Sequence, residues 1–249
     1  MHPLIEEIYR TRIIHDAAGQ PRDAFPASLR YEDGQALYRV VKESGAKNSL
    51  EVGMAYGVSS LFILQALKEN GGTYHASIDP WQEKWWQDIG LLNVQRGGFG
   101  DMHQLHRGPS YSVMPDLMKE ERRFDFIFID GNHRFEYTLM DFMYADMLLN
   151  TGGYIMLHDP WLPSIRKVIS FLITNRSEAY EFVTNYLHPP RNPVAGMKEF
   201  LTSVRKNPWD LRVAKFFARK SFDNYCVFRK TKHVEREAYD AAWDQYSPF

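Results

Sequence analysis

The sequence predicts an α/β fold with a doubly wound, mostly parallel sheet, and three observations support this. Short apolar segments alternate with segments of helical periodicity about five times along the chain. Nearly every strand-like segment ends in a glycine or an acid, which is typical of parallel strands whose carboxyl ends lead into ligand-binding loops at one edge of the sheet. The 249 residues suit a single domain with a sizeable core.

The predicted strands are short and rich in β-branched or aromatic residues, and they cover residues 48–53, 73–79, 102–108, 124–130 and 154–159. The predicted helices have apolar residues three or four positions apart, and they cover residues 32–44, 58–70, 82–95, 111–121, 135–149 and 164–174. Glycine pairs are expected to end two of them, Gly71-Gly72 and Gly152-Gly153. Pro115 is expected near the start of its helix, because proline is tolerated in the first turn.

Composition excludes several classes of function. The formal net charge is −1, which gives no electrostatic case for binding nucleic acid. Cys226 is the only cysteine, so an internal disulfide is excluded and a reducing compartment is favoured. No segment reads as a signal peptide or a membrane span. We therefore expect a cytoplasmic protein without a membrane partner.

The first strand leads into a glycine loop, Glu51-x-Gly53-x-x-x-Gly57-x-Ser59. Glycines let the backbone approach a ligand, and the helix that follows favours an anionic group at its N-terminus. The spacing differs from that of dinucleotide sites, and the carboxylate of Glu51 would repel a pyrophosphate and suit an amine. Asp79 follows at the distance typical of an acid that binds ribose hydroxyls. S-adenosylmethionine fits this set of groups; the alternative is that both acids are incidental.

Acidic and imidazole groups gather at the later strand ends. Asp130 and His133 follow the fourth strand, and His158 and Asp159 end the fifth. The carboxyl ends of parallel strands share one edge, so these four side chains are expected near the ligand.

The loop EVGMAYGVS and the block FDFIFIDGNHRFEYTLMDFMYADMLLNTGGYIMLHDPW resemble class I S-adenosylmethionine-dependent methyltransferases. The similarity is to the small-molecule O-methyltransferase branch, which includes catechol, caffeoyl-CoA, macrocin O-methyltransferase-like and cephalosporin-hydroxylase-like proteins. It covers roughly residues 45–175. It implies a Rossmann-like sheet in one domain, with a helical N-terminal extension (1–45), a cofactor-binding core (46–175) and C-terminal strands and substrate-side additions (176–249). Residues 224–230 are expected to pair with residues 180–186.

The resemblance implies roles at the cofactor site for residues in the motifs. The methionine end of the cofactor would lie on Glu51, Gly53, Tyr56, Gly57 and Ser59. Asp79 would hold the ribose, Ser110 would line the adenine, and Asp130 would lie near the methyl donor. The walls of the cofactor or substrate pocket would come from tryptophans, with Trp81, Trp85, Trp86 and Trp161 as candidates. Adjacent tryptophans cannot face the same way on a helix, so one of Trp85 and Trp86 is expected at a cleft or partner.

The resemblance also implies a divalent metal, Mg²⁺ or Mn²⁺, held by Asp130, His158 and Asp159. A nitrogen ligand is unusual for Mg²⁺, and Fe²⁺ or Zn²⁺ would tolerate the set as well. A general-base lysine of the catechol-type enzymes is matched in position by His133, a natural proton acceptor. A metal-free mechanism is therefore also open, in which His133 acts with Asp159 or His158. The plain structural alternative is a loop histidine bonded to Asp130.

The favoured function is O-methyl transfer from S-adenosylmethionine to a small-molecule metabolite, with His133, Asp130 and Asp159 as catalytic residues. One alternative is an N-methyltransferase acting on a small amine or amino-acid-like metabolite. Others are a non-catalytic cofactor-binding protein and a nicotinamide oxidoreductase, although the glycine spacing and Glu51 argue against the last. By analogy, a homodimer formed through terminal elements is compatible with the sequence.

Overall fold

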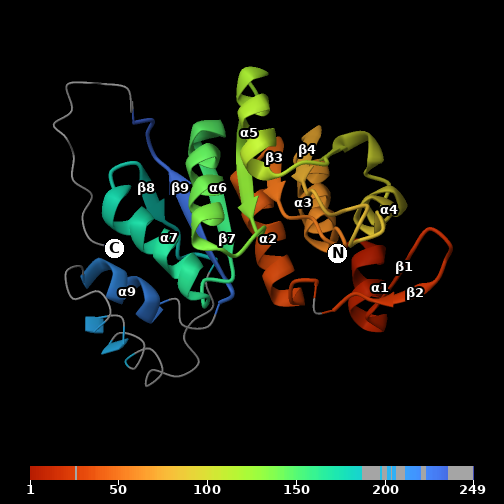
Figure 1. Ribbon diagram of the computed structural model, residues 1–249, viewed down its shortest axis with the longest axis horizontal. Helices are drawn as coiled ribbons and strands as arrows, with labels where there is room; N and C mark the ends of the chain where they lie inside the picture. Colours follow the sequence, from red (N-terminus) through yellow and green to blue (C-terminus); the bar gives the residue numbers. More distant parts are fainter. Residues whose placement is uncertain are drawn as a thin grey trace.

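The protein is built on a mostly parallel sheet with helices on both faces, as the sequence predicts (Figure 1). The computed structural model describes residues 1–25, 27–186, 197, 201–202, 204–205, 211–219, 223–234 and 249. Within these residues the main sheet has seven strands in the order β5-β4-β3-β6-β7-β9-β8. Their bounds are β3 Asn48–Val52, β4 Tyr74–Ile78, β5 His103–His106, β6 Phe124–Ile129, β7 Leu149–His158, β8 Tyr180–Phe182 and β9 Tyr225–Lys230.

The first five strands in the chain order of this sheet, β3 to β7, pair in parallel. β9 is antiparallel to β7 on one side and to β8 on the other. The expected pairing of residues 224–230 with residues 180–186 is confirmed, and β9 in addition joins this pair to the central sheet. Because β9 is antiparallel to β7, its first residue lies at the same edge as the last residues of β6 and β7.

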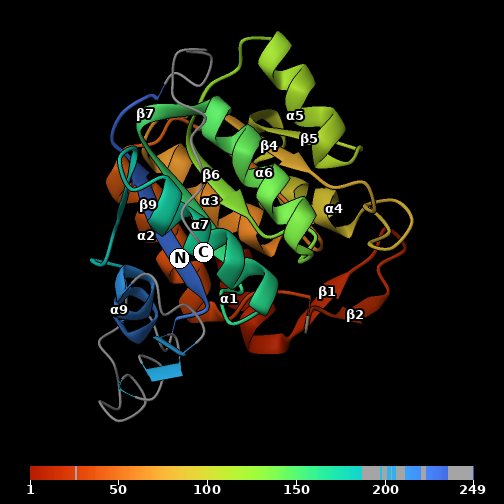
Figure 2. The same cartoon turned by 60° about the vertical axis from the view of Figure 1, so that its left-hand side comes forward.

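Two layers of helices cover the sheet. Figure 2 shows one layer in front of the strands and the other behind them. The front layer consists of α5 (Ser110–Lys119), α6 (Phe135–Leu148) and α7 (Pro163–Asn175). The rear layer consists of α1 (Pro3–Thr11), α2 (Tyr31–Ser44), α3 (Val58–Glu69) and α4 (Ile89–Arg96). A further helix, α9 (Leu211–Arg219), packs against α7.

Strand register explains the two hydrophobic cores. Leu50, Ile127 and Ile155 are aligned across three parallel strands and are buried against the front helices. Phe126 and Phe128 point the opposite way and are buried against the rear helices. Parallel strands are covered on both faces, so they read as continuous apolar runs rather than alternating ones.

The structure differs from the sequence expectations at several helix boundaries. The helix expected over 82–95 begins at Ile89, because Gln87 and Asp88 have positive φ angles of 52° and 55° that interrupt helical geometry. Pro115 lies inside α5 rather than at its start. The pair Gly152-Gly153 lies within β7 rather than ending a helix, which stops earlier at Leu148.

The N-terminal extension is not purely helical. Between α1 and α2 it forms a hairpin of β1 (Ile13–His15) and β2 (Pro21–Asp23), which projects from the body of the molecule in Figure 1. The hairpin is tied to α4 because the Arg96 guanidinium donates to the carbonyl of His15 at 2.7 Å. Within the described residues, none of the helices combines the length and apolar character that crossing a bilayer requires.

Candidate active site

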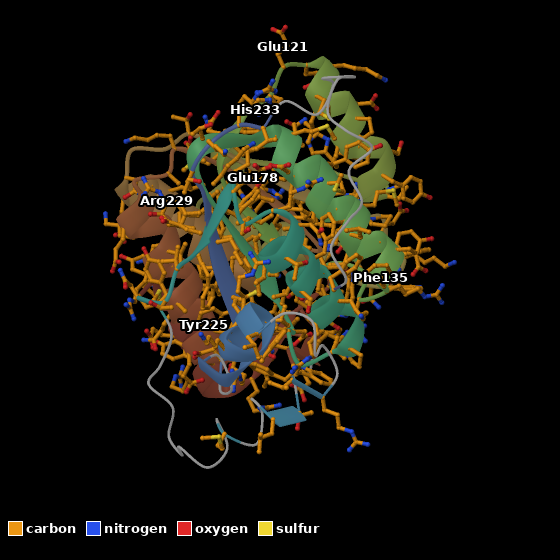
Figure 3. The ribbon with its side chains drawn as sticks, turned by 90° about the vertical axis from the view of Figure 1, so that its left-hand side faces the viewer. Glu121, Phe135, Glu178, Tyr225, Arg229 and His233 are labelled. Atoms are coloured by element: carbon orange, nitrogen blue, oxygen red, sulfur yellow. The ribbon has the colours of Figure 1, made fainter. Side chains whose placement is uncertain are left out.

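A cavity of about 850 Å³ opens at the carboxyl ends of the parallel strands. Its walls come from the loops after β3, β4, β5, β6 and β7, from residues 27–30 before α2, and from Asn224 before β9. Figure 3 shows this end of the molecule, where β9 starts at Tyr225 and α6 starts at Phe135; Arg229 and Glu121 lie toward the opposite end. The volume lies within the range of small-molecule sites, which is about 300–1,000 Å³.

The glycine loop after β3 lies directly against the end of β6. Gly53 has a φ angle of +90°, and a Cβ atom there would lie 2.2 Å from the Asp130 carbonyl oxygen. The Asp130 N–H donates to the Val52 carbonyl at 2.9 Å, which holds the two strand ends together. Only glycine fits at this position, so the residue predicted to approach the cofactor also brings Asp130 into the cavity.

Asp79, at the end of β4, fixes the same loop from the other side. Its Oδ2 accepts hydrogen bonds from the backbone N–H groups of Met54 at 3.2 Å and Ala55 at 2.9 Å. Its Oδ1 accepts from the N–H of Trp81 at 2.8 Å. Asp79 orders the loop, lines the cavity and is 4% exposed.

Some of the predicted cofactor residues line the cavity and others do not. The cavity lining includes Gly53, Ser59, Asp79, Trp81, Ser110 and Asp130. Glu51, Tyr56 and Gly57 are absent from it. Glu51 is fully buried, where it accepts a hydrogen bond from Ser60 Oγ at 2.7 Å and lies 3.3 Å from Nε2 of His75.

Aromatic side chains form one wall of the cavity. The rings of Trp81 and Trp85 stack with centroids 4.2 Å apart and planes at 11°, although both side chains are substantially exposed. Trp86 also lines the cavity and packs edge-on against Tyr56. The adjacent Trp85 and Trp86 both reach the cavity because residues 80–88 form turns rather than the expected helix. Exposed, stacked indoles of this kind provide flat apolar surface for an aromatic or heterocyclic ligand.

The cavity also carries a compact cluster of two aspartates and two histidines. Nε2 of His133 lies 3.4 Å from Asp130 Oδ1 and 3.2 Å from Asp159 Oδ2. Nδ1 of His158 lies 3.2 Å from the same Asp130 oxygen. All four residues line the cavity. The side chains that follow the fourth and fifth predicted strands therefore meet in the cavity, as the sequence predicts.

The carboxylates raise the pKa of both imidazoles. Hydrogen bonds to Asp130 and Asp159 raise the pKa of His133 to about 9. Burial lowers the pKa of His158. The negative charge of Asp130 and the hydrogen bonds of His158 to Asp130 and Asp33 outweigh this effect and raise the pKa to about 10. Burial alone would raise the pKa of Asp159, but its contacts with His133 and His158 hold it well below the usual range. With these pKa values both imidazoles are protonated at neutral pH. His133 must therefore lose a proton before it can act as a base.

Three residues that support this cluster are not indicated by the sequence, namely Asn224, Asp33 and Arg30. The Asn224 amide donates to Asp159 Oδ1 at 2.6 Å and lies 3.2 Å from His158 Nε2. Asp33, on α2, is buried with Oδ2 3.7 Å from the same nitrogen. Arg30 binds Asp33 through two hydrogen bonds of 2.8 Å. The sequence predicts the strand that follows Asn224, but it does not place that strand beside β7, and this pairing is what brings Asn224 to the site. Acids in the first turn of a helix, such as Asp33, are too common to indicate a site.

The cluster is chemically suited to a divalent cation. Asp130, His133 and Asp159 each offer one ligand atom, and these atoms lie within 4.8 Å of one another. His158, which the sequence analysis assigned to the metal, is not in this group, because its two ring nitrogens face Asp130 on one side and Asn224 and Asp33 on the other. Two carboxylates and one imidazole suit Mn²⁺, Fe²⁺ or Zn²⁺ better than Mg²⁺.

Comparisons with known proteins identify the fold. A methyltransferase-domain family model matches residues 50–160, which span the glycine loop, Asp79 and the acid–imidazole cluster. The structure aligns with an O-methyltransferase from Bacillus cereus solved with S-adenosylhomocysteine, at a TM-score of 0.58 and 21% identity, over 72% of this chain and 82% of that one. It aligns with a Podospora anserina methyltransferase at a TM-score of 0.61 and 16% identity, over 93% and 89%. The protein has the class I methyltransferase fold.

Sequence relatives point to the same group. The chain is 32% identical over 104 residues to caffeoyl-CoA O-methyltransferase 1 of Zea mays, covering 41% of this chain and 39% of the relative. It is 32% identical over 102 residues to the caffeoyl-CoA O-methyltransferase of Pinus taeda, covering 40% and 38%. The chain thus spans about two fifths of the length of these curated relatives. The resemblance to class I S-adenosylmethionine-dependent O-methyltransferases is confirmed.

Proposed function

We propose that the protein is an S-adenosylmethionine-dependent methyltransferase that transfers a methyl group to an oxygen of a small molecule. The observation that carries the proposal is that one cavity combines groups suited to binding the cofactor with groups suited to proton transfer. The Gly53 loop and Asp79 form one part, and the cluster of Asp130, His133, His158 and Asp159 forms the other. The structural neighbours solved with S-adenosylhomocysteine or S-adenosylmethionine support the choice of cofactor.

Methyl transfer is an in-line displacement, so the protein must orient donor and acceptor and remove the proton of the acceptor hydroxyl. His133 is the proposed proton acceptor, since it lines the cavity and its Nε2 lies between the carboxylates of Asp130 and Asp159. Its pKa of about 9 makes it a strong base that is mostly occupied by a proton at neutral pH. Deprotonation of His133 is therefore a required step before it can act.

A divalent metal on Asp130, His133 and Asp159 would lower the pKa of an acceptor hydroxyl and fix its position. The same imidazole cannot serve as ligand and base at once, so metal-assisted and histidine-assisted transfer are alternative modes of this site. In the metal-free mode, Asp130 and Asp159 stabilise the imidazolium that His133 becomes, and His158 with Asn224 keeps both carboxylates oriented.

The test is calorimetric titration of the metal-stripped protein with S-adenosylhomocysteine, alone and with Mg²⁺, Mn²⁺ or Zn²⁺, for wild type and Asp130→Ala. We expect cofactor binding without metal, and metal binding that Asp130→Ala abolishes. Cofactor binding with no metal binding would favour the histidine-assisted mode. Absence of S-adenosylhomocysteine binding would refute the methyltransferase proposal.

A further inference from the structure

Among the described residues that line the cavity, Arg30 is the only lysine or arginine. The other lining residues are apolar, acidic, imidazole or neutral polar groups. It lies in the segment that precedes α2, outside the methyltransferase-domain match at residues 50–160. Its side chain is 57% exposed. A cation in a cavity that already holds several carboxylates needs a chemical reason.

The orientation of the Arg30 guanidinium is fixed by Asp33. Nε and Nη2 each donate to one carboxylate oxygen of Asp33 at 2.8 Å. The Asp33 side chain is only 2% exposed, so the acid forms a rigid backing for the exposed guanidinium. Arginine has five N–H donors in a planar fork, and this pairing leaves the Nη1 edge for another acceptor. An arginine held in advance by a buried acid binds an anion with less loss of side-chain freedom.

The chain of contacts behind Arg30 leads to the reaction centre. Asp33 Oδ2 lies 3.7 Å from His158 Nε2, and His158 Nδ1 lies 3.2 Å from Asp130 Oδ1. Arg30 is therefore separated from Asp130 by one carboxylate and one imidazole. The N-terminus of α3, beyond the Gly53 loop, favours an anionic group and is the place expected for the carboxylate of the cofactor. The free edge of Arg30 is thus left for the molecule that accepts the methyl group.

We propose that Arg30 is a specificity-determining residue that binds a carboxylate of the acceptor, so the substrates of this enzyme are small hydroxylated acids. The proposal rests on the proposed function and narrows its substrate class. A carboxylate paired with the Nη1 edge of Arg30 would make a charge-assisted hydrogen bond. The hydroxyl to be methylated would lie toward Asp130 and His133.

The experiment uses the protein saturated with S-adenosylhomocysteine and three probe acids, namely benzoate, 3,4-dihydroxybenzoate and caffeate, each compared with its neutral amide by calorimetry. We expect at least one acid to bind wild type about 10- to 100-fold more tightly than its amide, the range expected for a hydrogen bond to a charged group. Arg30→Gln should remove that preference. Arg30→Lys should retain part of it, since the charge stays and the planar fork is lost.

Controls separate this proposal from its competitors. Arg134→Gln removes an exposed charge next to His133 that does not line the cavity, and it should leave the preference intact. Thermal unfolding of each variant checks that Arg30→Gln is folded. Methylthioadenosine lacks the carboxylate of S-adenosylhomocysteine. If Arg30→Gln instead weakens the binding of S-adenosylhomocysteine more than tenfold and leaves the binding of methylthioadenosine unchanged, Arg30 binds the carboxylate of the cofactor, and the proposal is wrong.

Equal affinity of wild type for each acid and its amide, or no binding by any of the acids, would also overturn the proposal. A preference for acids that persists in Arg30→Gln would assign it to another group. Failure of wild type to bind S-adenosylhomocysteine is a separate result, which refutes the proposed function before the acids are tested.

Discussion

Nδ1 of His158 lies 3.2 Å from Oδ1 of Asp130, and this contact joins the end of β7 to the end of β6 inside the cavity. The same oxygen lies 3.4 Å from Nε2 of His133. One carboxylate oxygen of Asp130 is thus within hydrogen-bonding distance of two imidazoles. The carboxylate is oriented by its neighbours before any ligand arrives, which is the arrangement expected of a preorganised site.

Metal binding to the cluster should release a proton from His133. Its pKa is raised to about 9, so at pH 7 the imidazole is protonated and must lose that proton to become a ligand. We expect Mn²⁺ affinity to rise about tenfold per pH unit below pH 9. Calorimetry in two buffers with different heats of ionisation should detect release of about one proton. In His133→Asn the release should disappear, whereas release that persists in this variant would assign the proton to another group.

Gly53→Ala should be far more harmful than Gly152→Ala, although both glycines have a φ of +90°. The backbone strain of roughly 1–2 kcal/mol is shared. A Cβ at residue 53 would in addition lie 2.2 Å from the Asp130 carbonyl, whereas residue 152 has open space. Urea unfolding should show a loss of about 1–2 kcal/mol at residue 152 and at least twice that at residue 53. Similar losses at the two positions would show that the strand ends can move apart.

The sequence predicted the sheet and the meeting of its strand ends for a physical reason. Parallel strands buried on both faces leave long apolar runs, and their carboxyl ends share an edge. Asp130, His133, His158 and Asp159 could therefore be assigned to one site without knowing the fold in detail. The apolar runs and the polar residues that follow them are both encoded in short segments of the sequence.

The rest of the site depends on contacts between distant segments, which short patterns do not encode. Asp33 reads as an ordinary acid in the first turn of α2, yet it lies against His158. Residues 82–88 have helical periodicity, but left-handed backbone at Gln87 and Asp88 turns them into the loop that brings Trp85 and Trp86 to the cavity. The hairpin β1–β2 carries little apolar signal because most of its side chains are exposed.

Glu51→Gln should affect stability more than cofactor affinity. The sequence suggested direct contact with the cofactor, but Glu51 is fully buried and bonded to Ser60, with His75 Nε2 at 3.3 Å. Replacing a buried acid so that one of its hydrogen-bond partners is left unsatisfied costs about 1–3 kcal/mol. We expect a loss of that size in urea unfolding and less than a threefold change in the Kd for S-adenosylhomocysteine. A large loss of affinity with unchanged stability would restore Glu51 to the binding site.

Asp141 offers a test of pH-dependent stability away from the cluster. It is buried on α6, where loss of hydration raises its pKa to about 6 despite a hydrogen bond from Ser110. Among the described residues its Oδ1 has no hydrogen-bond partner. In the unfolded chain the carboxyl has a pKa of 3.8. Between these two values the folded state binds more protons, so its contribution to stability is complete below pH 3.8 and is lost as the pH rises to about 6.

Asp141→Asn keeps the shape of the side chain and removes this dependence. A rise from 3.8 to about 6 corresponds to roughly 3 kcal/mol, so the variant should be more stable than wild type by up to that amount at pH 7.5. The gain should shrink steadily as the pH falls toward 4. Urea unfolding across this range measures it, with Asp116→Asn, an exposed acid on α5, as a control that should change stability by no more than about 0.5 kcal/mol. A variant less stable than wild type at pH 7.5 would mean that the charged carboxylate makes a favourable contact in the folded protein, and that its burial is not the dominant cost.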